Sequence, residues 1–167
     1  MPRTVGRATA RVAAVRMDSS HALPLGQLTT YRDGSDAKLD ATGDLPPGAG
    51  AVLRRVPREW FVPDRSWAPD GERYRPIDRA VDPEAWLAAV YRNAPIVTQF
   101  DDGQVPWPLV GDRPACSASM PSVVLGMLSA LDVQPGQSVL EIGTGTGFNA
   151  ALLASWSVHW SRDNRRG

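Results

Sequence analysis

The chain has 167 residues, enough for the core of one domain, and its 18 basic and 18 acidic residues leave no net charge. The balanced charge argues against a large basic surface for nucleic acid or acidic lipid, and the single cysteine, Cys116, excludes an internal disulfide. The basic N-terminus is not followed by an apolar run of signal-peptide length, and no stretch approaches the ~18 apolar residues of a membrane helix. We therefore expect a cytoplasmic protein that binds neither nucleic acid nor membrane.

Residues 1–50 are rich in Gly, Ala, Asp, Ser and Pro and contain few large apolar side chains. We expect a flexible leader with little core, in which only Ala8–Met17 is a candidate short helix. The pattern changes at Ala51–Val56, which is apolar at helical spacing and precedes a proline. Trp60–Pro63 then adds large apolar side chains, Trp60 among them, that we expect to pack on a core.

The polar, proline-containing segment 64–81 is predicted to be loop. A helix is predicted to begin at Asp82-Pro83-Glu84, because these residues combine an N-cap acid, a proline at the first helical position and an acid near the positive end of the helix dipole. Asn93 and Pro95 are predicted to end this helix. Its apolar stripe is Trp86, Leu87, Val90 and Tyr91.

The β-branched and aromatic run Ile96–Phe100 predicts a strand, and Asp101-Asp102-Gly103 predicts the turn that follows it. A second helix is predicted to begin at Pro121. The apolar residues that helical spacing places on one of its faces are Val123, Val124, Met127, Leu128 and Leu131.

A short apolar stretch, Val139–Ile142, leads directly into three glycines and then into a helix predicted from Phe148 to about Trp156. We expect the stretch to be a buried strand. Glycines let the backbone turn sharply and approach a ligand closely, and the helix N-terminus offers unpaired N–H groups. This order is typical of a nucleotide-type site, although a plain glycine-rich turn between a strand and a helix has the same composition.

Two classes of nucleotide site compete for this loop. The dinucleotide fingerprint requires glycine at its first, third and sixth positions, which are Gly143, Gly145 and Phe148 here, so its third glycine is missing. The spacing is instead an acid, Glu141, followed by Gly143, Gly145 and Gly147 at every second position. This form resembles the loop of class I S-adenosylmethionine-dependent methyltransferases, whose ligand has an ammonium group that an acid suits.

Four segments in order resemble the front half of the protein-L-isoaspartate O-methyltransferase family. That family has a V-P-R-x-x-F-V-P segment, a T-x-S-x-P segment that leads into a helix, and a V-L-E-I-G-T-G-[ST]-G-[YF]-x-A-A-x-L-A motif. The resemblance covers residues 51–154. The matching segments are Val56–Pro63, Ser117–Pro121, the helix with Gly126-Met127-Leu128, and Val139–Ala154.

The resemblance implies S-adenosylmethionine as the cofactor. It also implies a substrate that is a protein or peptide with an aspartyl or isoaspartyl carboxylate. It places the catalytic hydroxyl at Ser119, beside the substrate carboxylate, which it would orient. The cofactor-binding residues would be Glu141, Gly143, Thr144, Gly145 and Gly147, and no metal site is implied.

Some residues depart from the family pattern, and one has a second interpretation. Ser117 takes the place of the family's threonine and Met120 that of its usual glutamine, and the segment between Pro63 and Ser117 is longer than in housekeeping members. Ser119 lies two residues before a helix-starting proline, so its hydroxyl could instead cap that helix.

A doubly wound domain needs several more βα units of ~30 residues each, whereas only Ser155–Gly167 follow the first helix motif. We therefore expect an α/β protein with an incomplete Rossmann-like class I methyltransferase fold: a first strand, glycine loop and helix, preceded by a mostly helical N-terminal region. The expected organisation is a leader at 1–50, a substrate-side region at 51–137, the start of the cofactor domain at 138–156 and an aberrant tail at 157–167.

The leading functional hypothesis is a truncated and inactive member of the isoaspartate-type carboxyl O-methyltransferases. A second hypothesis is a non-enzymatic remnant that binds a peptide or protein through residues 51–131. A third is a dinucleotide-binding fragment, which Phe148 in place of the third glycine disfavours.

Overall fold

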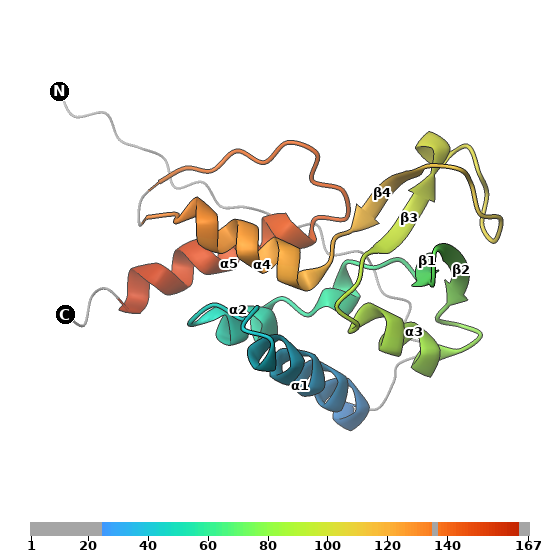
Figure 1. Ribbon diagram of the computed structural model, residues 1–167. Helices are drawn as coiled ribbons and strands as arrows, with labels where there is room; N and C mark the ends of the chain where they lie inside the picture. Colours follow the sequence, from blue (N-terminus) through green and yellow to red (C-terminus); the bar gives the residue numbers. More distant parts are fainter. Residues whose placement is uncertain (1–24, 135–136, 164–167) are drawn as a thin grey trace.

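A computed structural model describes residues 25–134 and 137–163, so the predicted helix at Ala8–Met17 lies outside the described residues (Figure 1). The strands and α3 lie at one side of the view, and α4 and α5 lie together at the other, with α1 and α2 below them. In chain order the elements are α1 (Leu25–Ala41), α2 (Ala49–Arg55), η2 (Arg58–Trp60), β1 (Arg65–Asp70), β2 (Arg73–Asp78), α3 (Pro83–Val90), β3 (Ile96–Phe100), η3 (Asp101–Gly103), β4 (Pro114–Ala118), α4 (Pro121–Leu131) and α5 (Phe148–Asp163).

The strands form one antiparallel sheet in the order β2-β1-β3-β4. On one face the sheet packs against α3, through Trp86, Leu87 and Val90. On the other face an aromatic cluster is centred on Phe100, whose ring meets the Trp67 ring edge to face at 5.1 Å between centroids. The sheet is therefore a folded unit with apolar packing on both sides.

The second core lies between helices. Val52 of α2, Val124 and Leu128 of α4, and Phe148 and Leu152 of α5 are buried against one another. This core holds the first turn of α5 against the rest of the molecule.

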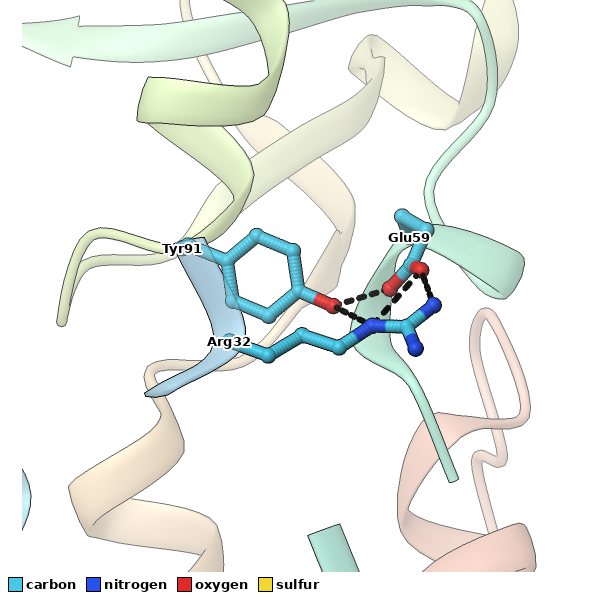
Figure 2. Close-up of polar contacts among 3 residues, drawn as sticks. All are labelled: Arg32, Glu59 and Tyr91. Carbon is cyan, nitrogen blue, oxygen red and sulfur yellow. Dashed lines mark hydrogen bonds and ion pairs between the residues drawn. The ribbon is translucent and has the colours of Figure 1, made fainter. Parts of the chain in front are cut away.

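The turn that contains η2 connects the two cores through two buried charges of opposite sign. Arg58 and Glu59 are adjacent in sequence and each is only 3% exposed. Glu59 accepts hydrogen bonds from Arg32 of α1 and from the Tyr91 hydroxyl at the end of α3 (Figure 2). Burial and the nearby carboxylate raise the pKa of Tyr91 above its usual value, so the phenol stays protonated and donates a hydrogen bond to Glu59.

Segment 64–81 is a β-hairpin rather than the predicted loop. Its two strands pair from Arg65 with Asp78 to Asp70 with Arg73. The prolines that favoured a loop lie where a missing N–H does no harm. Pro76 is on the edge strand β2, and Pro69 lies beyond the single residue pair that joins β1 to β3.

The expectation of a leader with little core is wrong for residues 25–50. This part forms α1 and the start of α2, and Leu39 and Ala49 are buried against Leu125 of α4. The polar composition of α1 gave no signal, because contacts with other elements hold this helix. The expectation that Trp60 packs in the core is also wrong, since Trp60 is 49% exposed.

Near the glycine loop the structure differs from the prediction in two elements. Val139–Ile142 forms no strand, and Leu140 and Ile142 are 85% and 89% exposed. In Figure 1 the stretch that leads to the glycine loop is drawn as an arc and not as a strand arrow. The predicted helix at Phe148 is present, but it continues past Trp156 to Asp163.

The apolar face predicted for α4 is only partly buried. Val124 and Leu128 are buried as expected, together with Leu125, whereas Val123, Met127 and Leu131 face outward. The exposed side chains of α4 and of Val139–Ile142 together make up much of the exposed large apolar surface of the described residues.

Several further predictions from the sequence are confirmed. The α/β class is observed, α2 covers most of Ala51–Val56, β3 spans Ile96–Phe100 and α4 begins at Pro121. The cap of α3 is also present, because Asp82 Oδ1 accepts a hydrogen bond from the Ala85 amide at 2.9 Å.

The Asp82 cap generates a stability prediction. Asp82→Ala removes the acceptor for one unpaired helix amide and should lower the free energy of unfolding by about 1 kcal/mol. Asp82→Asn keeps an acceptor of the same shape and should cost much less. Urea unfolding of both variants followed by circular dichroism measures the difference. Equal losses in the two variants would mean that the charge and not the cap is what stabilises α3.

Candidate functional site

The glycine loop depends on three glycines in the left-handed region. The φ angles are 77° at Gly143, 58° at Gly145 and 86° at Gly147. An L-residue pays roughly 1–2 kcal/mol for this conformation, whereas glycine adopts it readily. Spacing alone predicted a glycine loop, and the backbone shows why each of the three positions is glycine.

The loop rests on β4 and on the turn that follows η2. A Cβ placed on Gly145 would lie 3.5 Å from the Ser117 carbonyl oxygen and 3.7 Å from Cys116 Sγ. One placed on Gly147 would lie 3.9 Å from the Phe61 ring. Around Gly143 nothing lies within 4 Å. The loop is therefore packed at its second and third glycines and open at its first.

Glu141 is held by the loop and by α5. Its carboxylate accepts hydrogen bonds from Asn149 Nδ2 at 2.6 Å and from the Thr144 hydroxyl at 3.3 Å. Sequence analysis selected Glu141 and Thr144 but missed Asn149. Its position eight residues after Glu141, in the first turn of the next helix, is the signal that could have identified it.

Ser119 does not cap α4. The N-cap residue of α4 is Met120, whose side chain makes no capping hydrogen bond. The Ser122 amide in the first turn donates instead to Asn93 Oδ1 at 3.1 Å. Ser119 is exposed, and its hydroxyl has no hydrogen-bond partner within the described part of the chain. The capping alternative is thus wrong, and the hydroxyl is available to a ligand.

Arg58 binds the backbone that carries Ser119, and sequence analysis assigned it no role. Its Nη2 lies 2.8 Å from the Ser119 carbonyl oxygen and 3.0 Å from that of Ala118. Burial lowers the pKa of Arg58 to about 10, so the side chain remains a cation at neutral pH. The proline-arginine pair within Val56–Pro63 was part of the motif, but a motif does not show which carbonyls the arginine binds.

The structure therefore brings part of the predicted site together. The glycine loop meets β4 at Cys116 and Ser117, and β4 leads directly to Ser119. It does not form the buried strand that was expected to precede the loop, because Val139–Ile142 lies in solvent.

Residues 25–134 and 137–163 contain neither a metal-ion cluster nor a helix that could span a membrane. No group of three or more His, Cys, Asp or Glu side chains there could hold a metal ion. None of the helices in this part of the chain is both long and apolar enough to cross a bilayer.

Comparison with known proteins decides the family. A family model described as protein-L-isoaspartate(D-aspartate) O-methyltransferase matches residues 72–160, more than half of the chain. The chain belongs to this family. The dinucleotide-binding hypothesis is therefore set aside.

Individual relatives carry the same name. A protein-L-isoaspartate O-methyltransferase 1 of Nitrosospira multiformis is 32% identical over 119 residues, which are 70% of this chain and 36% of that protein. A protein-L-isoaspartate O-methyltransferase of Methylorubrum extorquens is 35% identical over 124 residues, 74% of this chain and 39% of that protein. One from Pyrococcus horikoshii is 56% identical over 36 residues, 22% of this chain and 16% of that protein. The first two relatives match most of this chain. The chain in turn covers little more than a third of the length of each of them.

Membership of the protein-L-isoaspartate O-methyltransferase family implies a methyl donor, and the loop chemistry fits one. The amino-acid end of S-adenosylmethionine carries an ammonium group, which a half-buried carboxylate can bind, and a carboxylate group, which the amides of an open glycine loop can bind. Glu141 and the open side of Gly143 supply both features. The donor set therefore fits the amino-acid end of this cofactor.

The loop conformation generates a second prediction, with a glycine elsewhere as control. Gly147→Ala forces an L-residue to a φ of 86° and should cost about 1–2 kcal/mol of unfolding free energy. Gly126→Ala, in the middle of α4 with nothing within 4 Å of the added Cβ, should instead stabilise by about 0.5–1 kcal/mol. Urea midpoints of the two variants give the signs. A Gly147→Ala variant as stable as wild type would contradict the left-handed loop.

Proposed function

We propose that the chain carries the substrate side and the first part of the cofactor site of an L-isoaspartate-type protein carboxyl O-methyltransferase that uses S-adenosylmethionine. The observation that supports this most is the contact of Gly145 with Ser117, because it brings the glycine loop against the strand that leads to Ser119. A cofactor loop and a substrate hydroxyl must be neighbours for methyl transfer.

Positioning is the main task of the protein in this chemistry. S-Adenosylmethionine, when bound, supplies an electrophilic methyl group. A substrate carboxylate is ionised at neutral pH, so it needs no general base. The exposed Ser119 hydroxyl donates a hydrogen bond to one carboxylate oxygen and orients the other. This role needs a free hydroxyl on a fixed backbone, and both properties are present at Ser119.

The cofactor side is assigned to Glu141, Gly143, Thr144, Gly145 and Gly147. Glu141 receives the ammonium group of the cofactor, and the bonds from Asn149 and Thr144 hold its carboxylate in place. The open side of Gly143 allows the ligand to approach the backbone. Each oxygen of Glu141 keeps a lone pair for the ligand after accepting one bond from the protein.

The 167 residues taken alone are expected to bind the cofactor weakly or not at all and to show no turnover. Val139–Ile142 supplies the acid of the site, yet in the described residues no strand pairs with it. Asn149 and Thr144 fix the Glu141 carboxylate relative to the loop, but an unpaired segment does not fix it relative to the Ser119 side as closely as catalysis requires. We thus infer that these 167 residues by themselves are inactive.

The alternative is a non-enzymatic module that binds a peptide or protein. The outward-facing apolar side chains of α4 favour it, because such surface is costly to leave in water. Saturable binding that is equally tight for peptides with and without an isoaspartyl carboxylate, and that does not change with cofactor, would support this alternative.

The functional prediction is tested with an isoaspartyl peptide and radiolabelled S-adenosylmethionine. We expect no methyl ester above the background of a reaction without protein, and no saturable heat when S-adenosylhomocysteine is titrated into the chain. A methyl ester formed by the wild type and lost in Ser119→Ala, but kept in the exposed control Ser129→Ala, would contradict inactivity while supporting the role of Ser119.

A further inference from the structure

We propose that Arg58 is the positioning residue of the substrate side: its buried guanidinium fixes the backbone of Ala118–Ser119 and thereby the Ser119 hydroxyl relative to the glycine loop. This inference rests on the proposed function for its meaning, but the geometry of Arg58 is independent of it. Arg58 touches no substrate and acts through Ser119.

The guanidinium of Arg58 joins three segments through carbonyl oxygens alone. Nη1 lies 2.6 Å from the carbonyl oxygen of Val90 and 3.2 Å from that of Arg92. Nη2 lies 2.8–3.0 Å from those of Ala94, Ala118 and Ser119. One side chain therefore links the end of α3, the start of β3 and the end of β4.

Stability alone does not account for a cation at this place. Arg58 is 3% exposed, and within the described residues no carboxylate forms an ion pair with it. Removing an unpaired charge from water costs several kcal/mol, which the hydrogen bonds from Arg58 to the carbonyl oxygens offset. What the guanidinium adds is a planar array of donors that holds several carbonyls in one geometry, which neither an apolar side chain nor lysine can reproduce.

Arg58 also lies between the substrate side and the cofactor side. Its guanidinium carbon is 6.0 Å from the centre of the Phe148 ring, the first residue of α5 after the glycine loop. Phe148 in turn packs on Phe61, at 5.7 Å between ring centroids. Because the same residue contacts the Ser119 carbonyl and the start of α5, it sets their separation.

The chain contains a matched control for Arg58. Glu59 is the next residue of η2 and equally buried, but its hydrogen-bond partners are Arg32 and Tyr91, and within the described residues no hydrogen bond joins its side chain to the Ser119 segment. Glu59→Gln should therefore destabilise the fold without moving Ser119. Arg58→Lys keeps the charge but loses the planar array, and Arg58→Met keeps the aliphatic stem and loses the charge.

Methionine methyl groups report the position of the Ala118–Ser119 segment. The chain has four methionines: Met1, Met17, Met120 and Met127. Met120 follows Ser119 directly, and Met127 lies on the outward side of α4 as an internal reference. We expect Arg58→Lys to shift or split the ¹³C-methyl signal of Met120 and to leave that of Met127 in place. Glu59→Gln should leave both signals in place, even where its urea midpoint falls as far.

Affinity for a fluorescent isoaspartyl peptide is the second readout. If the wild type binds the peptide, Arg58→Lys should weaken binding about tenfold, as expected when one hydrogen bond to a charged group is lost. Arg58→Met should do the same if it folds, and Glu59→Gln should bind like the wild type.

The outcomes separate the two proposals. An unchanged Met120 signal in Arg58→Lys overturns the positioning role whatever the peptide does. A displaced Met120 signal in a protein whose wild type binds no isoaspartyl peptide supports the role of Arg58 in placing Ser119 and counts against the proposed function alone. Equal displacement in Arg58→Lys and Glu59→Gln would show a general loosening of the fold and would also overturn the inference.

Discussion

The structure depends on two neighbouring charges that are buried in one short helical turn. Arg58 and Glu59 point to different partners: the guanidinium binds backbone carbonyls at the ends of α3 and β4, and the carboxylate binds α1 and Tyr91. Each charge is expensive to bury and depends on hydrogen bonds to its partners, although Arg58 Nε has no partner within the described residues. The turn thus joins two sets of elements through separate contacts: Arg58 joins the end of α3 to the Ser119 segment, and Glu59 joins α1 to the end of α3.

The glycine loop is well packed, but the stretch that leads into it is not. Its second and third glycines are packed against β4 and Phe61, and its acid is bound by Asn149, so the loop itself has a definite shape. The stretch before it, Val139–Ile142, is apolar yet exposed and unpaired in the described residues. A methyltransferase needs both a shaped loop and a rigid strand before it, and only the first is present. This difference is the physical basis for expecting a prepared substrate side and a weak cofactor side.

The sequence predicted the elements whose signals are local. The cap and proline of α3, the β-branched run of β3 and the spacing of the three glycines all depend on residues within a few positions. It failed where contacts between distant segments determine the structure. Polar α1 is held by other elements, the prolines of the hairpin are tolerated at an edge, and Val139–Ile142 has strand composition without a partner. For the site, motif matching selected Ser119 and Glu141 but could not identify Arg58 or Asn149, whose roles lie in what they bind.

Hydrogen exchange of backbone amides tests the central claim most directly, because it compares the two halves of the site in one experiment. The amides of β3 lie in the middle of the sheet and should exchange only on global unfolding. The account predicts that the amides of Val139–Ile142 exchange at close to the rate of an unstructured peptide, while those of β3 are strongly protected. Protection of Val139–Ile142 comparable to that of β3 would contradict it, since the segment would then be paired in solution and the cofactor side would be as well formed as the substrate side.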